Sequence, residues 1–182
     1  MPKMIVIRHE RCMGCRQCMI ECAMAHTEAP TLVEAVRSGA ALQPRVHVEP
    51  AGLHGMPLQC RHCEDAPCMT VCPTEAIHRP VERGPVLIDA ARCIGCKFCL
   101  LACPFGVIEQ SRDGKATVKC DLCIKRTEAG QEPACVAGCP TGALQFCEID
   151  EWLREQRRAT AERVAEGGAR AQRAAAEFDH GR

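Results

Sequence analysis

Sixteen cysteines of this 182-residue chain fall into four runs whose spacing is suited to binding metal clusters. In each run a fourth cysteine follows the third after three residues, and in the last three runs a proline comes next. This pattern is typical of bacterial [4Fe–4S] ligation, so it predicts four [4Fe–4S] clusters and the transfer of single electrons. The runs are Cys12, Cys15, Cys18 and Cys22 (run one); Cys60, Cys63, Cys68 and Cys72 (run two); Cys93, Cys96, Cys99 and Cys103 (run three); and Cys120, Cys123, Cys135 and Cys139 (run four).

Disulfides and structural zinc are the two other uses of so many cysteines. Disulfides suit small secreted proteins, and the sequence shows no export signal. Zinc sites usually take two Cys-x2-Cys pairs and have no need for a third and fourth cysteine followed by proline. Iron–sulfur ligation is therefore favoured. Cys147 lies outside the runs in a strand-like segment, and we expect it to pack as a small apolar side chain.

The composition makes the clusters the expected centre of the fold. Four phenylalanines, one tryptophan and no tyrosine provide little aromatic mass for an ordinary core. We therefore expect the clusters to stabilise the fold by cross-linking distant parts of the chain, and we expect the apo-protein to be largely unfolded. Basic residues among the ligands are expected either to offset cluster charge or to raise individual reduction potentials. They are Arg16, Arg61, His62, Lys97, Lys119 and Lys125.

The elements that position the runs predict which runs share clusters. Residues 73–78 and 86–89 flank a Gly-Pro turn between runs two and three, and they predict a β-hairpin. Strand-like residues 4–7 precede run one and residues 143–146 follow run four, so these segments are expected to lie side by side. Two further short strands around Asp113-Gly114 predict a hairpin that joins the two halves.

This arrangement nests the pair of runs two and three inside the pair of runs one and four. Sequential pairing is the alternative, and it would leave 37 residues between one pair and 16 between the other. In two-cluster proteins with such runs, the fourth cysteine of one run ligates the cluster of the other. The favoured ligand sets are Cys12, Cys15, Cys18 and Cys139 (set A); Cys120, Cys123, Cys135 and Cys22 (set B); Cys60, Cys63, Cys68 and Cys103 (set C); and Cys93, Cys96, Cys99 and Cys72 (set D).

The predicted fold class is α+β, with two nested, tandem bacterial-ferredoxin-like modules of short strands and helices around the clusters, and a C-terminal helix. The expected parts are an outer module (residues 1–26 and 110–149), a connector (27–57), an inner module (58–109) and a C-terminal helical arm (150–182).

Three segments outside the ligand pattern are candidates for covering or contact surfaces. The connector is expected to contain a helical turn at residues 32–36 and a strand at 45–49, which either cover the seam between the modules or dock a partner. Residues 64–67 in run two and 124–134 in run four are inserts, and both are expected to form surface loops beside a cluster.

The C-terminal arm differs in composition from the rest of the chain. Asp150 is suited to cap a helix that runs to about Glu166, where Gly167 and Gly168 are expected to interrupt it before a second helical segment at residues 169–177. A lone helix rich in Ala, Arg and Glu has little reason to stay ordered. Docking on a partner subunit or on a second copy of the chain is therefore favoured over a solvated helix with a frayed end.

The sequence resembles the four-cluster ferredoxin-like electron-transfer subunits, over Ile5 to about Ile149. That family serves molybdenum and tungsten oxidoreductases, formate dehydrogenases, hydrogenases and carbon monoxide dehydrogenases, and the resemblance implies the same nested pairing. The chain is most similar to the small soluble subunits of hydrogenase–formate lyase, carbon monoxide dehydrogenase and tungsten aldehyde oxidoreductase type. Run one departs from the pattern, because Ala23 follows Cys22 where proline is usual, but proline is not a ligand. The motifs that carry the resemblance are Cys12-Met13-Gly14-Cys15, Gln59-Cys60-Arg61-His62-Cys63-Glu64-Asp65-Ala66-Pro67-Cys68, Cys93-Ile94-Gly95-Cys96-Lys97-Phe98-Cys99, Ala102-Cys103-Pro104-Phe105-Gly106 and Lys119-Cys120-Asp121-Leu122-Cys123.

Together, the motifs and the resemblance predict a non-catalytic subunit that relays single electrons through four [4Fe–4S] clusters. The expected partner is a catalytic oxidoreductase subunit: a tungsten or molybdenum aldehyde or formate oxidoreductase, a hydrogenase or a carbon monoxide dehydrogenase. A free polyferredoxin carrier and a self-assembling conductive filament subunit are the alternatives. No nucleotide fingerprint, nucleophile–base constellation or DNA-binding motif occurs in the sequence. Without an export signal or a membrane-spanning run, we expect a cytoplasmic protein with no nucleic-acid partner and no direct membrane insertion.

Overall fold

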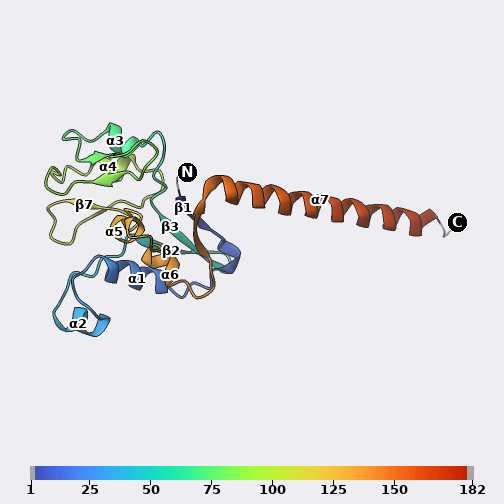
Figure 1. Cartoon of the computed structure of the whole chain (residues 1–182), viewed down its shortest axis with the longest axis horizontal. Coiled ribbons are helices and arrows are strands. Elements are labelled where there is room, and N and C mark those ends of the chain that lie inside the picture. The colour runs from blue at the N-terminus through green and yellow to red at the C-terminus, as the bar shows by residue number, and fades with distance from the viewer. Residues whose placement is uncertain (1–2, 180–182) are drawn as a thin grey trace. The chain divides into compact units, whose positions relative to one another are not determined.

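The computed structural model describes residues 3–179 and divides into two units (Figure 1). The first unit extends to Phe146, and the second begins at Cys147 and contains the long C-terminal helix. All four cysteine runs belong to the first unit, so the electron-carrying groups are expected there.

Short strand pairs form the framework of the first unit. Within residues 3–179 the strands pair into four two-stranded sheets, and three of these are antiparallel pairs of strands that follow each other in the sequence. Isolated two-stranded sheets are marginally stable at best in water, so packing around the cysteines has to hold them. The pairs are β1 (Lys3–Ile7) with β8 (Leu144–Glu148), β2 (Val46–Ala51) with β3 (His54–Gln59), β4 (Ile77–His78) with β5 (Leu87–Ile88), and β6 (Glu109–Gln110) with β7 (Thr117–Val118).

Short helices carry many of the cysteines. Cys18 and Cys22 lie on α1, one turn apart, and α3, α4 and α6 each carry one ligand. The helix of the connector, α2, begins at the N-cap residue Thr31, whose side chain accepts the Glu34 N–H at 3.2 Å and donates to the Glu34 carboxylate at 3.0 Å. The helical elements of the first unit are η1 (His9–Arg11), α1 (Gln17–Ala25), α2 (Leu32–Arg37), α3 (Pro67–Thr70), α4 (Phe98–Ala102), α5 (Ile124–Glu128) and α6 (Ala134–Ala137).

Two buried clusters of apolar side chains divide the cysteines between them. The first contains Ile5 and Leu144 from the two ends of the unit, together with cysteines of runs one and four. Val46 and Val48 of the connector strand β2 also belong to it. The second contains Val86 and other residues of the middle of the chain, with cysteines of runs two and three. Each core therefore brings together apolar residues and thiols of different runs, and Cys60 of run two also packs against the first core.

Several predicted segments occur as expected, and one strand was missed. Ile77 pairs with Ile88 in the first predicted hairpin, and Glu109 pairs with Val118 in the second. The helix α2 and the strand β2 lie where the connector was expected to form them. The sequence did not predict β3, which contains Pro57, because proline is uncommon inside strands.

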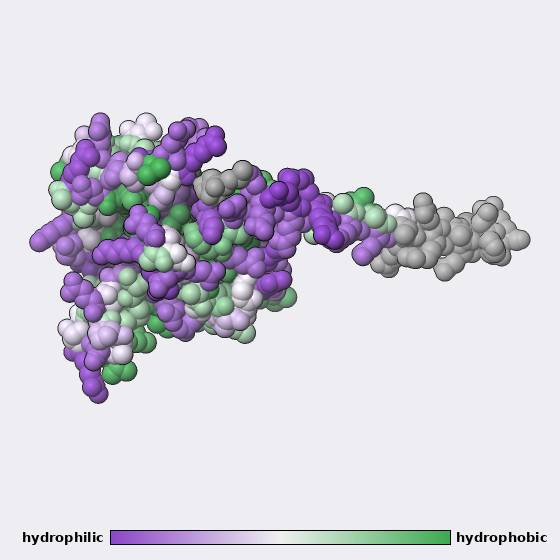
Figure 2. Space-filling view, in the orientation of Figure 1, coloured by the Kyte–Doolittle hydropathy of each residue, from purple (hydrophilic) through white to green (hydrophobic). Residues whose placement is uncertain are grey.

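The second unit is dominated by α7 (Ile149–Asp179), a single helix of 31 residues. Its continuity corrects the predicted interruption at Gly167 and Gly168. Glycine inside a helix costs only about 1 kcal/mol relative to alanine, and neither glycine adopts the positive φ that ends many helices. The described side chains of α7 are mostly hydrophilic (Figure 2), and two apolar side chains of this helix, Leu153 and Val164, are also exposed to solvent. None of the helices within residues 3–179 has both the length and the apolar character needed to cross a membrane.

Candidate iron–sulfur centres

A left-handed backbone turn precedes the second cysteine of every run. Glycine adopts this conformation freely, whereas it costs other residues about 1–2 kcal/mol. The turn brings backbone N–H groups toward the first sulfur: the N–H of His62 donates to Cys60 Sγ at 3.4 Å, and that of Leu122 donates to Cys120 Sγ at 3.5 Å. Because the turn recurs even where the residue is not glycine, we infer that thiol placement requires it. The φ angles are 73° at Gly14, 48° at His62, 66° at Gly95 and 56° at Leu122.

The four cysteines of set C line one pocket. Cys60, Cys63 and Cys68 of run two lie around it together with Cys103 of run three. Apolar side chains, including the buried Val86 and Ile108, complete its wall. Four thiols in an apolar enclosure suit a cluster that is shielded from water.

The four cysteines of set D line a second pocket. Cys93, Cys96 and Cys99 of run three lie there with Cys72 of run two. The hydroxyl of Thr117, on β7, lies 3.9 Å from Cys93 Sγ and 3.7 Å from Cys99 Sγ. A hydroxyl at this position is able to donate a hydrogen bond to either thiolate.

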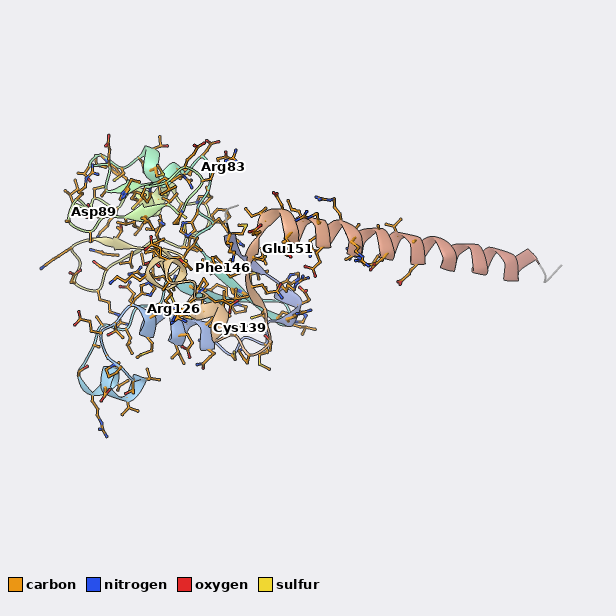
Figure 3. All side chains as sticks on the ribbon, viewed as in Figure 1. Arg83, Asp89, Arg126, Cys139, Phe146 and Glu151 are labelled. Atoms are coloured by element: carbon orange, nitrogen blue, oxygen red, sulfur yellow. The ribbon has the colours of Figure 1, made fainter. Side chains whose placement is uncertain are left out.

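Set A gathers around Cys18 on α1. Burial, and then the charges of Cys139, Cys15 and Cys12 in that order, raise the pKa of Cys18 to about 11. Cys139, which follows α6 and is labelled in Figure 3, comes from the opposite end of the unit's sequence. Run one therefore meets the last cysteine of run four rather than acting alone.

Set B gathers around Cys135 on α6, and all four of its cysteines are buried. Burial, and then the charges of Cys120, Cys22 and Cys123, raise the pKa of Cys135. A smaller effect comes from Cys18, so sets A and B are neighbours. Burial likewise raises the pKa of Cys120 to about 12.

The thiols as a whole fit iron–sulfur clusters. Burial disfavours a charged thiolate, which is why it also raises the pKa of Cys68, Cys99 and Cys123. A positively charged iron–sulfur core would remove that cost, since thiolates are the ligands such cores take. Four thiols at each centre, with no carboxylate among the predicted ligands, match this donor chemistry.

Cys72 and Cys139, two of the four ligands expected to cross between runs, differ from the buried thiols in the direction of their pKa shift. Although their burial acts to raise the pKa, hydrogen bonds from the backbone that follows each cysteine outweigh it and lower the pKa of both. The hydroxyls of Thr74 and Thr141 lie 3.8 Å from the respective sulfurs. Both cysteines begin the same local sequence, Cys-Pro-Thr-x-Ala. The same kinds of backbone and threonine hydrogen bonds therefore favour the thiolate form of each cysteine.

A half-buried polar network that the sequence did not predict supports Cys22. The N–H of Arg45 donates to Cys22 Sγ at 3.2 Å, and its guanidinium donates to Asp121 at 2.7 Å. His26 lies 3.1 Å from the same carboxylate, on the other side. Burial opposes the charges of both groups, but their mutual hydrogen bond raises the pKa of His26 to about 9 and lowers that of Asp121 to about 2. Because 76 residues separate Arg45 from Asp121, no local sequence pattern would have revealed this network.

The insert at residues 124–134 is only partly a loop, because it contains α5, so the expectation of a simple surface loop was wrong for its first half. Cys147 lies in β8, is half-buried, and stands outside the four sets.

Comparison with known families adds an independent finding to this geometry. Residues 53–149, more than half of the chain, match the model of the 4Fe–4S dicluster domain. The chain belongs to the 4Fe–4S dicluster domain family. The match extends from the start of β3 through runs two, three and four.

Curated relatives of this family member carry electron-transport names. The chain is 41% identical over 165 residues to the putative electron transport protein YsaA of Escherichia coli (87% of this chain, 98% of the relative). It is 37% identical over 180 residues to the electron transport protein HydN of Escherichia coli (88% and 98%). It is 38% identical over 143 residues to the thiosulfate reductase electron transfer subunit PhsB of Salmonella typhi (78% and 73%).

Proposed function

We propose that the chain is a non-catalytic electron-transfer subunit that holds four [4Fe–4S] clusters through ligand sets A to D. A [4Fe–4S] cluster, when bound, accepts and releases single electrons. The observation that carries the proposal is the grouping of thiols: three cysteines of one run meet the fourth cysteine of another at each of the four centres. The relatives' electron-transport names support the same role.

We further propose that the sets follow one another in the order A, B, C, D. The charge of Cys18 acts on Cys135, which supports A beside B, and the charge of Cys60 acts on Cys120, which supports B beside C. Cysteines of sets C and D share one buried core. Set B is buried throughout, whereas sets A and D each have one exposed cysteine, Cys15 and Cys96 respectively. Exposed thiols at the two ends suit electron entry and exit.

The nested modules are proposed on the same grounds. The pairing of β1 with β8 and a first core built from both ends of the unit support an outer module of residues 1–26 and 110–149. The pairing of β4 with β5 and the second core support an inner module of residues 58–109. Gln43 of the connector donates to the Gln110 carbonyl at 2.9 Å, next to the boundary between the modules, which supports a covering role for the connector.

Catalysis is proposed to belong to a partner oxidoreductase subunit. One relative, PhsB, is the electron transfer subunit of a thiosulfate reductase, which is a precedent for such an assembly. Exposed apolar side chains next to the exposed cysteines, Met13 at one end and Ile94 at the other, suit docking surfaces. The described part of α7 is exposed along most of its length, and we propose it as an arm that docks on the partner or on a second copy.

The test is to tag the full chain in its native host, purify it under anaerobic conditions and measure size and metals together. A subunit elutes with a larger protein whose metal identifies its class: tungsten or molybdenum for aldehyde or formate oxidoreductases, nickel for hydrogenase or carbon monoxide dehydrogenase. Elution as a small particle with iron as its sole metal would identify a free carrier and contradict the subunit role.

A further inference from the structure

A buried lysine lies between the inner and outer parts of the first unit. Lys119 is only 3% exposed, although it follows directly on β7 and precedes the set B ligand Cys120. Its ammonium group donates to the carbonyl oxygen of Val86, next to β5, and to that of Cys120 at 3.1 Å. Two neutral carbonyls compensate only part of the cost of burying a full charge, so a buried ammonium calls for an anion nearby.

That anion is available at set C. Val86, which accepts from Lys119, also lines the pocket of set C. The thiol of Cys68 experiences the lysine directly: burial raises its pKa, and the positive charge of Lys119 is the largest effect that opposes this. The thiols of Cys60 and Cys120 are themselves close enough for their charges to interact. Lys119 therefore contacts the backbone of set B at Cys120 and, at Val86, the backbone of a residue that lines the set C pocket.

The ring of His62 also contacts the backbone of Val86. The N–H of Val86 donates to Nδ1 of His62 at 3.0 Å, so the proton of the neutral ring is on Nε2. His62 lines the set C pocket, and its Nε2 atom is buried without a hydrogen-bond partner among residues 3–179. An orphaned buried donor is costly, and the sulfur atoms of a cluster in the pocket would provide an acceptor.

We propose that Lys119 and His62 set the reduction potential of the set C cluster, Lys119 through its buried charge and His62 through an N–H donated to cluster sulfur. The inference rests on the proposed function, because it assumes a cluster at set C. Each electron that arrives there adds one negative charge. A buried cation and a hydrogen-bond donor favour the more negative state, so both residues raise the potential. Electrons that cross between the outer and inner parts are held at set C before they move on.

The experiment compares anaerobic redox titrations of the reconstituted full-length chain, followed by electron paramagnetic resonance, with iron and sulfide counted on the same samples. Lys119→Met removes the charge and keeps the length of the side chain. His62→Asn removes the Nε2 donor and keeps a residue that tolerates positive φ. Lys115→Met is the matched control, because Lys115 is exposed and only four residues away from Lys119.

In Lys119→Met we expect one of the four one-electron steps to become at least about tenfold less favourable, a shift of about 59 mV to lower potential. His62→Asn moves the same step in the same direction by less. Lys119→Arg returns it toward the wild-type position, and raising the ionic strength leaves the difference in place, because a buried charge is poorly screened. Lys115→Met moves no step.

Unchanged potentials in Lys119→Met at full iron content would overturn the proposal, as would an equal shift in Lys115→Met. If neither Lys119→Met nor Lys119→Gln assembles its clusters, the lysine is structural and the proposal also falls. Failure of the proposed function has a different signature, because the wild-type chain itself would then lack the four one-electron steps.

Discussion

The close approach of β3 to run one provides a test of the set A site. Gly55, in β3, donates its N–H to the carbonyl oxygen of Cys12 at 3.2 Å. A β-carbon added at Gly55 would lie 2.9 Å from Cys12 Sγ, 2.9 Å from Gly14 Cα and 3.1 Å from Val48 Cγ1. Two of these three neighbours are a ligand sulfur and a backbone atom, which have little freedom to move. Gly55→Ala is therefore expected to strain the set A site specifically.

The size of the effect follows from the overlap. The new methyl group has to gain about 0.5 Å, from 2.9 Å to the ordinary contact distance of 3.4 Å, against both Cys12 and Gly14. Such overpacking typically costs about 1–3 kcal/mol. If the whole cost falls on cluster retention, it weakens binding at set A by between about fivefold and about 150-fold.

The assay is the time course of iron release to a ferrous chelator from anaerobically reconstituted protein. We expect Gly55→Ala to release about four of its irons faster than the wild type and the remainder at the wild-type rate. Gly168→Ala is the control, because nothing lies within 4 Å of the added carbon there and the backbone has no positive φ. Wild-type release kinetics in Gly55→Ala would refute the placement of β3 against run one.

Three other predictions concern ligand pairing, the arm and the metal. Replacing both Cys22 and Cys123 with alanine should remove about four irons, because both cysteines belong to set B. Replacing both Cys22 and Cys15 should remove about eight irons, because these cysteines belong to two different sets. The reverse result would mean that each run ligates a single cluster. Deleting residues 150–182 should leave the iron count unchanged but abolish co-purification with the partner, and a truncated chain that still co-purified stoichiometrically would exclude the docking arm. Stripping the iron should abolish hydrogen-exchange protection in the first unit, and native-like protection in the apo-protein would show that its apolar cores suffice.

Short-range features of the site were predictable from the sequence, and long-range ones were not. The spacing of the cysteines indicated which thiols of a run lie close together, because local backbone turns bring the first members of each run together, and glycine at positions 14 and 95 is consistent with the positive φ found there. The strand segments that predicted hairpins were short, but the turns between them, at Gly84-Pro85 and Asp113-Gly114, were informative.

The supporting contacts of the site depend on tertiary placement. Nothing near Asp121 in the sequence indicates Arg45 or His26, and nothing near Lys119 indicates that the Val86 carbonyl accepts a hydrogen bond from its ammonium group. The error at Gly167 and Gly168 has a different cause. A local helix-breaking preference of about 1 kcal/mol per glycine was given more weight than the strong helix formers on both sides of the pair.

We propose four clusters in one chain, whereas the description of the family, a dicluster domain, names two. The most direct measurement is the iron and acid-labile sulfide content of the anaerobically reconstituted full-length chain, with Mössbauer spectra of the same 57Fe-enriched sample. Four sites predict about sixteen irons per chain, all in [4Fe–4S] form. About eight irons, with half of the sixteen ligand cysteines still reactive toward a thiol reagent, would contradict the account.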